Sequence, residues 1–473
     1  MPEKYHIPIK TAAPRFHPVG KYAVIEFRED CAGSCRACVK KTCVYHIFKD
    51  NVLHMAAMRE PEYLYTCQSC FRCIQECTRG IFSRVINPDY RELGDRYWRA
   101  ENIHSLWYQA HTGKIPVSGA GYRGPFAGEG FDGMWTDMSE IVRPTRDGIH
   151  GREYINTSIE ISRRITPLAF DAEQRLAVKT PTLLEIPLPM VFRLPPNFAA
   201  GPSARLSVIK AAAACGTLMM LEDRECSPYL KDYADQIIPC LTKKSLSGQH
   251  DLIASVRALE IPFAAALDDT LDGIRAVNPD AAVIVRMPLD DEAPDRASAV
   301  AAMEVDALYF FADDHGRGLG GNPAACLRDL IRAVHLRLVD DRRRQHINLL
   351  FSGGIAMAEH MAKAIICGAD GVVLGIPLLL ALECRLCFDC RAGRPCPVAL
   401  DETFDAQWGA QRIINLLGAW HSQLIEVMGA MGIRDVRRLR GEIGRSMWFD
   451  DLEKEHFSPV FGEKKRPQAA NGG

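Results

Sequence analysis

The chain has 473 residues, with 57 Lys and Arg against 59 Asp and Glu, which gives a formal net charge of −2. Its composition, 47% hydrophobic and 25% charged, is that of an ordinary globular protein and excludes a fibrous or largely disordered chain. The near-neutral charge argues against nucleic acid or an anionic membrane surface as the main partner.

Two features predict where the protein resides. The longest mostly apolar run, 371–382, is shorter than the roughly 20 residues that cross a bilayer, and the opening MPEKYHIPIK lacks the apolar core of a signal peptide. We therefore expect no membrane span and a cytoplasmic location. Because cytosolic thiols are kept reduced, the 17 cysteines predict metal ligation and not disulfides.

Two runs of four cysteines come first along the chain. The first run is Cys31, Cys35, Cys38 and Cys43, and the second is Cys67, Cys70, Cys73 and Cys77. Such short spacings let one loop supply three thiolates to an iron–sulfur cluster, and in two-cluster ferredoxins the fourth cysteine of each run ligates the other cluster. On that pattern Cys77 completes the first cluster and Cys43 the second. The alternative is a pair of structural zinc sites, whose ligands usually come as separated C-x2-C pairs.

A literal G-x-G-x-x-G pattern lies at 119–124. A dinucleotide-binding fingerprint has to follow a strand and open a helix, but Pro125 and further glycines come next. We therefore expect no NAD(P) site here, and electrons have to come from a partner.

From about residue 185 to residue 382, short apolar runs alternate with amphipathic helical stretches, a pattern typical of βαβ units and a parallel sheet. The strand candidates are 186–192, 217–221, 236–241, 262–267, 281–287, 306–311, 347–351 and 371–374. Eight repeats in about 200 residues predict an α/β fold with a closed (β/α)8 TIM barrel. An open, doubly wound sheet is the alternative.

The last two predicted strands both end in glycine-containing loops. The first loop contains Ser352, Gly353 and Gly354, and the second contains Gly375 and Ile376. Glycine lets backbone N–H groups approach an anion, a following helix adds a favourable dipole, and barrels often bind phosphate at this place. The sequence therefore predicts a phosphate-bearing cofactor, with two tight turns that need positive φ as the alternative.

A third cysteine group follows the second glycine loop. It comprises Cys384, Cys387, Cys390 and Cys396, and a proline comes directly after it. Four thiolates within thirteen residues predict a further iron–sulfur cluster, with a zinc loop as the alternative. The five remaining cysteines are expected to be core residues, because most stand in apolar surroundings.

The order of these parts resembles the iron–sulfur glutamate synthase family, specifically its FMN-binding barrel. The segment that carries the likeness, residues 349–400, is LLFSGGIAMAEHMAKAIICGADGVVLGIPLLLALECRLCFDCRAGRPCPVAL. In the family this segment holds the FMN phosphate after strands seven and eight and continues into a cysteine cluster closed by Cys-Pro. The N-terminal cysteine runs resemble those of archaeal-type members that carry a ferredoxin module.

The resemblance implies roles for particular residues. It assigns the FMN phosphate to Ser352, Gly353, Gly354, Gly375 and Ile376. Where family members have a lysine on strand five near the flavin, this chain has Arg286, a candidate for both cofactor binding and catalysis. Asp313, Asp314 and His315, after strand six, are candidates for acid–base chemistry, with a solvated polar loop as the alternative. The loops after strands one and two depart from the family motifs.

The expected domains are an extension at 1–30, a two-cluster ferredoxin-like domain at 31–85, a wrapping segment at 86–180, the barrel at 181–450 and a tail at 451–473. With FMN and three clusters, all expected to be [4Fe–4S], two functions are open. The chain is an oxidoreductase that passes electrons between ferredoxin-type clusters and FMN to reduce an imine or 2-oxo acid-derived substrate in amino-acid metabolism. Alternatively, it is an electron-transfer subunit whose barrel is a flavin relay without glutamate synthesis.

The expected partners are redox subunits, linked to ferredoxin, NAD(P)H or a quinone as electron donor or acceptor. No cysteine stands close enough to the N-terminus to act as a glutaminase nucleophile, so any amide hydrolysis is expected from a separate glutaminase subunit. We therefore expect the chain to be part of a hetero-oligomer.

Overall fold

The computed structural model describes residues 6–16, 18–26, 44, 70–115, 130–136, 155–162, 169–177, 182–242, 248–264, 267–303, 305–321 and 325–462. Five predicted cluster ligands lie outside these residues: Cys31, Cys35, Cys38, Cys43 and Cys67. The other three of the N-terminal set are described: Cys70 is exposed, Cys73 is buried and Cys77 is partly buried.

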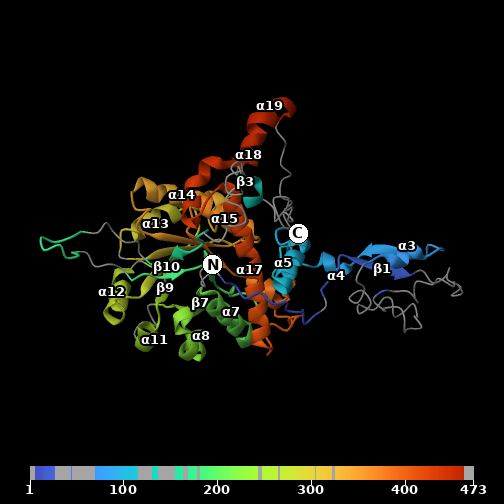
Figure 1. The fold of residues 1–473 in the computed structure, drawn as a ribbon, viewed down its shortest axis with the longest axis horizontal. Coiled ribbons are helices and arrows are strands. Elements are labelled where there is room, and N and C mark those ends of the chain that lie inside the picture. The colour runs from blue at the N-terminus through green and yellow to red at the C-terminus, as the bar shows by residue number, and fades with distance from the viewer. Residues whose placement is uncertain are drawn as a thin grey trace.

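Eight parallel strands close into a barrel in the order β10-β11-β12-β13-β6-β7-β8-β9 (Figure 1). They are β6 (Met190–Phe192), β7 (Met219–Glu222), β8 (Ile237–Cys240), β9 (Ala258–Pro262), β10 (Ala282–Pro288), β11 (Ala307–Phe311), β12 (Asn348–Ser352) and β13 (Gly371–Leu374). Strands covered by helices on one side and packed inside on the other are apolar along nearly their whole length. The predicted (β/α)8 barrel is confirmed, and the open sheet is excluded.

Helices follow the strands and surround the barrel. They are α7 (Pro202–Cys215), α8 (Asp223–Cys226), α9 (Leu230–Tyr233), α11 (His250–Ser255), α12 (Leu267–Val277), α13 (Ala293–Val300), α14 (Leu327–Asp340), α15 (Ala358–Cys367) and α16 (Ile376–Ala381). The long helix α17 (Ala406–Met431) begins where the Asp405 carboxylate caps the Gln407 N–H at 2.8 Å, and it packs along α7. None of the described helices is both long and apolar enough to cross a membrane.

Two barrel strands differ from the sequence prediction. Strand four is β9 at 258–262 and not 262–267, because the ionisable Glu260 interrupts the apolar run that the prediction followed. Glu260 is nevertheless fully buried. Strand one is shorter than predicted, since Ile186 lies in β5 (Glu185–Ile186), which pairs with β4 (Ile159–Glu160) outside the barrel.

The remaining elements come from the two ends of the chain. The antiparallel pair of β1 (Tyr22–Glu26) and β2 (Phe82–Ile86) packs with α3 (Arg72–Glu76) around a small separate core, at the end of the molecule away from the barrel (Figure 1). Helices α4 (Pro88–Arg91) and α5 (Ala100–Thr112) lead back to α17. Strand β14 (Ser446–Trp448) pairs with β3 (Met134–Thr136) and precedes α18 (Phe449–Leu452) and α19 (Ser458–Phe461).

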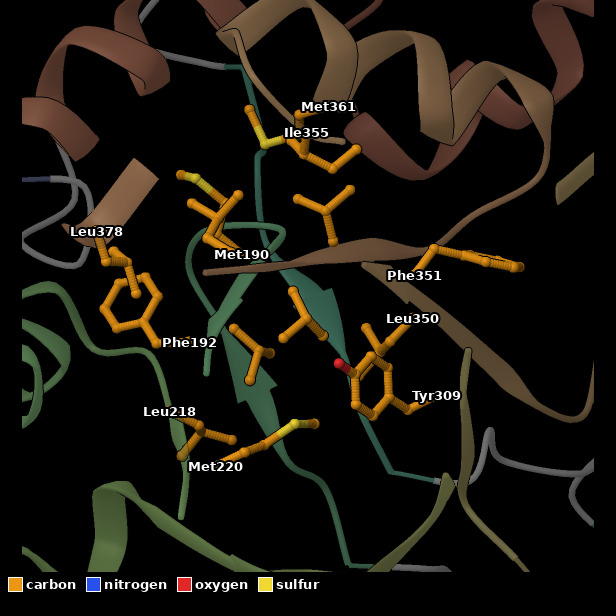
Figure 2. Packing of buried hydrophobic residues seen from close by; sticks show 14 of the residues in the cluster. Met190, Phe192, Leu218, Met220, Tyr309, Leu350, Phe351, Ile355, Met361 and Leu378 are labelled. Atoms are coloured by element: carbon orange, nitrogen blue, oxygen red, sulfur yellow. The ribbon is translucent and has the colours of Figure 1, made fainter. Parts of the chain in front are cut away.

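Large apolar side chains fill the barrel wall and its interior. Figure 2 shows Leu350 of β12 near the ring of Tyr309, with Met190 and Phe192 of β6 across the same core, whereas the side chain of Phe351 points away from Tyr309. Phe351 is fully buried and stacks on Phe310 with 5.2 Å between ring centroids. Packing of this density makes the core sensitive to lost volume.

Replacing Phe351 by alanine should therefore lower the free energy of unfolding by about 3–5 kcal/mol, because it leaves a cavity that the neighbouring rings cannot fill. Phe457→Ala is the matched control, since Phe457 is 48% exposed, and it should change the value by less than about 0.5 kcal/mol. Denaturant unfolding measures both. Equal losses for the two variants would contradict this packing.

Candidate active site

The predicted site residues meet at the carboxyl-terminal rim of the barrel. Arg286 lies on β10, His315 follows β11, Ser352 ends β12 and Gly375 follows β13. These four strands are neighbours in hydrogen-bonded order, so closure of the parallel sheet brings their carboxyl ends to one edge. The structure therefore gathers all the predicted barrel residues on the face where such barrels carry their chemistry.

The loop after β12, residues 352–357 and here the β12 loop, presses against the loop after β11, residues 312–317 and here the β11 loop. Gly353 and Gly354 have φ of 101° and 62°. A Cβ on Gly353 would lie 2.5 Å from the Asp313 carbonyl oxygen, and one on Gly354 would lie 2.5 Å from the Gly316 nitrogen. Both glycines are therefore needed for this close approach.

Some backbone N–H groups of these loops have no protein acceptor. Within the described residues, those of Gly353, Gly354 and Ile355 donate no hydrogen bond, and neither does that of Gly375 at the start of α16. Unpaired backbone N–H groups beside glycines form a concavity suited to an anion. The chemistry of these donors fits a phosphate group.

The three predicted acid–base residues of the β11 loop already have partners. The Asp313 carboxylate accepts the N–H groups of His315 at 2.9 Å and Arg317 at 2.7 Å, which shapes the turn. Asp314 forms an ion pair with Arg391. His315 Nε2 lies 2.7 Å from Asp95 Oδ2. A catalytic role for these residues stays a prediction.

The Asp95–His315 pair shifts the pKa values of both groups. The hydrogen bond to Asp95 raises the pKa of His315 above its usual value. Burial alone would raise the pKa of Asp95, but hydrogen bonds from His315 and from two backbone N–H groups bring it below its usual value. The stabilisation of the folded state by protonated His315 is lost as pH rises through its raised pKa. The stabilisation by ionised Asp95 is lost as pH falls through its lowered pKa.

Asp95→Asn should therefore return the pKa of His315 towards its ordinary value, which a titration of the imidazole C–H signal by NMR measures. The stability difference from the wild type should be largest at roughly pH 4–6.5 and stay below about 1 kcal/mol, since both groups are partly exposed. An unchanged pKa of His315 in the variant would rule the pairing out.

A charged network that the sequence did not reveal occupies the centre of the rim. Arg193, directly after β6, contacts Glu260 Oε2 through Nη1 at 2.6 Å and Glu222 Oε1 through Nη2 at 2.8 Å. Arg286 Nε lies 3.1 Å from Glu260 Oε1, an ion pair without hydrogen-bond geometry. The two arginines and two glutamates balance in charge, so Arg286 is a partly neutralised cation.

The network extends to neighbouring polar groups. Burial alone would lower the pKa of Arg193, but the adjacent Glu260 charge outweighs it and raises that pKa. Burial raises the pKa of Tyr309 to about 12, so its hydroxyl stays protonated 2.8 Å from Ser352 Oγ. A lone glutamate inside an apolar strand, as in ALEIP, was the one sequence signal that could have revealed this centre.

Arg193→Met should lower the free energy of unfolding by about 3 kcal/mol, because the buried Glu260 carboxylate keeps only its ion pair with Arg286. Adding Glu260→Gln to that variant should restore most of the lost stability, because the buried negative charge at residue 260 is then removed as well as its positively charged partner. Denaturant unfolding of both single variants and the double variant gives the coupling energy. Strictly additive losses would show that the two side chains do not interact.

The third cysteine group, 384–396 and here the cysteine loop, follows α16. Cys384 is buried, and its Sγ accepts the Leu386 N–H at 3.5 Å. Phe388, between Cys387 and Cys390, has φ of 58° and ψ of 13° and precedes a short helical turn. Phe71, between Cys70 and Cys73, has nearly the same angles, 58° and 9°, before α3. Two distant Cys-Phe-x-Cys segments therefore share one backbone turn.

The distances between possible metal-ligand atoms differ between the cysteines and a second group of residues, which is Asp132, Glu359 and His360. Among the described residues, no three cysteine Sγ atoms lie within 4.8 Å of one another. The ligand atoms of Asp132, Glu359 and His360 do, and His360 Nε2 lies 3.2 Å from Asp132 Oδ1. That pair is explained by a buried hydrogen bond and needs no metal.

Comparison with known proteins finds that the chain is similar to glutamate synthases. Residues 242–434 match the family model described as the conserved region in glutamate synthase. The archaeal-type glutamate synthase (NADPH) of Dehalococcoides mccartyi is 23% identical over 88% of this chain and 93% of its own. The archaeal glutamate synthase (NADPH) of Methanocaldococcus jannaschii is 26% identical over 82% and 94%. These homologues support an oxidoreductase enzyme and leave its substrate open.

Solved structures give a weaker likeness. A mandelate oxidase structure has a TM-score of 0.39 and 17% identity, and covers 66% of this chain and 98% of its own.

Proposed function

We propose that the chain is an FMN- and iron–sulfur-dependent oxidoreductase of the glutamate synthase type. It passes electrons between ferredoxin-type clusters and FMN, and reduces an imine or 2-oxo acid-derived substrate in amino-acid metabolism. One observation carries this proposal: α16 begins at the Gly375 loop and ends just before Cys384, so the two candidate cofactor sites share one short helix.

Residues of this chain suit FMN at the rim. The unpaired N–H groups of Gly353, Gly354 and Gly375 would hold its phosphate, together with Ser352 and Ile376. Arg286 would lie beside the ring, with its charge partly balanced by Glu260. When bound, FMN supplies transfer of one or two electrons.

Local geometry favours clusters over zinc at the cysteines. A mononuclear zinc site with Zn–S of about 2.3 Å places its sulfurs about 3.8 Å apart. No three Sγ atoms of the cysteine loop, which the structure describes throughout, lie within 4.8 Å of one another, and the same Cys-Phe-x-Cys turn occurs at Cys70 and at Cys387. We propose one [4Fe–4S] cluster on Cys384, Cys387, Cys390 and Cys396. Two more would use the N-terminal set as the sequence predicts.

A second function is favoured by the charge network. Arg193 pairs with Glu222 and Glu260 at the centre of the rim, and the β11 loop residues are held by Asp95 and Arg391. Side chains that already form ion pairs with one another are less available to bind substrate. The alternative is therefore an electron-transfer subunit whose flavin is a relay, joined in a hetero-oligomer with redox subunits or with a separate glutaminase. Either function suits a cytoplasmic protein.

The phosphate site is tested by Gly375→Val, which should release FMN and leave the cysteine-bound iron in place. Gly375 does not have positive φ, so valine adds no left-handed backbone strain. An added Cβ would lie 3.0 Å from the Arg193 carbonyl oxygen, so the variant adds bulk beside the proposed phosphate site. Gly444→Val is the control, because an added Cβ there meets no atom within 4 Å. Absorbance at flavin wavelengths after gel filtration measures retention. Flavin bound equally in both variants would refute the site.

The enzyme and relay functions are separated by stopped-flow reoxidation. Protein reduced with dithionite should be reoxidised by 2-oxoglutarate with ammonia or an amine if the chain is the enzyme. No reoxidation by these imine-forming mixtures, with rapid reoxidation by a copurifying subunit, would establish the relay and contradict the enzyme.

A further inference from the structure

Residues 94–98, here the strap, form a tight turn between α4 and α5. The Asp95 carboxylate accepts the N–H groups of Tyr97 at 2.7 Å and Trp98 at 2.8 Å, and the Asp95 N–H donates to the Trp98 carbonyl at 3.1 Å. Gly94 has φ of 68°, and a Cβ there would lie 1.8 Å from the Trp98 carbonyl oxygen. The turn therefore requires glycine at its first position.

The strap contacts three loops that are far from it in sequence. The Gly94 N–H donates to the Arg385 carbonyl of the cysteine loop at 3.3 Å. The indole N–H of Trp98, a fully buried residue, donates to the Asp314 carbonyl of the β11 loop at 2.8 Å. The Tyr97 hydroxyl donates to the Gly354 carbonyl of the β12 loop. Five residues thus link the cysteine loop with both loops of the proposed flavin site.

We propose that the strap is a positioning element for both cofactor sites, because holding two carbonyl groups orients the N–H groups on the same peptide planes. This inference rests on the proposed function. In a trans peptide the C=O and the following N–H point in opposite directions. A donor that holds the carbonyl from one side therefore directs the N–H to the other side.

The first oriented peptide lies in the cysteine loop. Gly94 holds the Arg385 carbonyl, and the N–H of the same peptide, on Leu386, points to Cys384 Sγ at 3.5 Å. From α5, the indole N–H of Trp107 donates to the Cys384 carbonyl at 3.3 Å and holds the preceding peptide as well. Hydrogen bonds to cluster sulfurs are among the features that set reduction potential, and losing one disfavours the more negative reduced state.

The second oriented peptide lies in the β12 loop. Tyr97 holds the Gly354 carbonyl, so the Ile355 N–H of the same peptide faces away from Tyr97 and finds no acceptor in the described residues. His360 Nδ1 lies 3.4 Å from the same carbonyl, but it accepts the Ala356 N–H at 3.3 Å and so has no proton to donate there. Burial raises the pKa of Tyr97 well above its usual value, which keeps the hydroxyl a donor.

The flavin arm of the test uses the full chain, stripped of FMN and titrated with FMN by fluorescence quenching. Tyr97→Phe keeps the ring and removes the donor, and should weaken FMN binding about five- to tenfold while lowering the thermal midpoint by only a few degrees. Tyr108→Phe is the control, because Tyr108 is exposed on α5, and its affinity should equal that of the wild type.

The cluster arm measures the reduction potential of the cysteine-loop cluster by EPR-monitored titration. Gly94→Ala breaks the strap turn and should move that potential to a more negative value. Gly462→Ala is the matched control, since Gly462 has a similar φ, 77°, has open space around it and lies outside both proposed cofactor sites. Its potential should equal that of the wild type.

The outcomes separate this inference from the function on which it rests. Wild-type protein that binds no FMN would overturn the proposed function and the strap's role together. FMN binding by the wild type and by Tyr97→Phe with equal affinity would overturn only the role of Tyr97. A potential unchanged in Gly94→Ala, or shifted equally in Gly462→Ala, would overturn the role at the cysteine loop.

Discussion

The pairing of β13 with β6 determines where the candidate site residues of the rim lie. It closes the barrel, and the Arg193 N–H donates to the Leu374 carbonyl at 2.9 Å across this junction. Closure places the glycine loop of the last strand beside the cation that follows the first strand. An open sheet would leave them at opposite edges. The β12 loop, the charge network and the start of α16 are therefore neighbours because the sheet closes.

The rim divides into two regions with different character. On the side of β12 and β13 the backbone presents glycines and unpaired N–H groups, which suit a fixed anionic group. At the ends of β6 to β10 charged side chains pair with one another around the fully buried Glu260. Buried ion pairs contribute less to stability than to a defined arrangement. A cofactor is thus well accommodated, while a substrate meets side chains that already have partners.

The sequence predicted the features that depend on a local pattern of residues, namely the strands and the glycine loops. Alternation of apolar runs and helical stretches identified the eight strands, and the glycine loops were placed correctly because their spacing is local. The fourth strand was misplaced because the buried, ionisable Glu260 breaks the apolar run. The strap was missed for another reason. Its contacts to Gly354 and Asp314 join residues 257 and 216 positions apart, and no periodic pattern records them.

The proposed flavin and iron–sulfur content is measured by cofactor analysis of anaerobically purified protein. Iron, acid-labile sulfide, zinc and FMN would be quantified together per chain. We expect about twelve irons with matching sulfide, because three four-cysteine sets would each hold a four-iron cluster, together with one FMN. Stoichiometric zinc without acid-labile sulfide, in protein that lacks FMN, would contradict it.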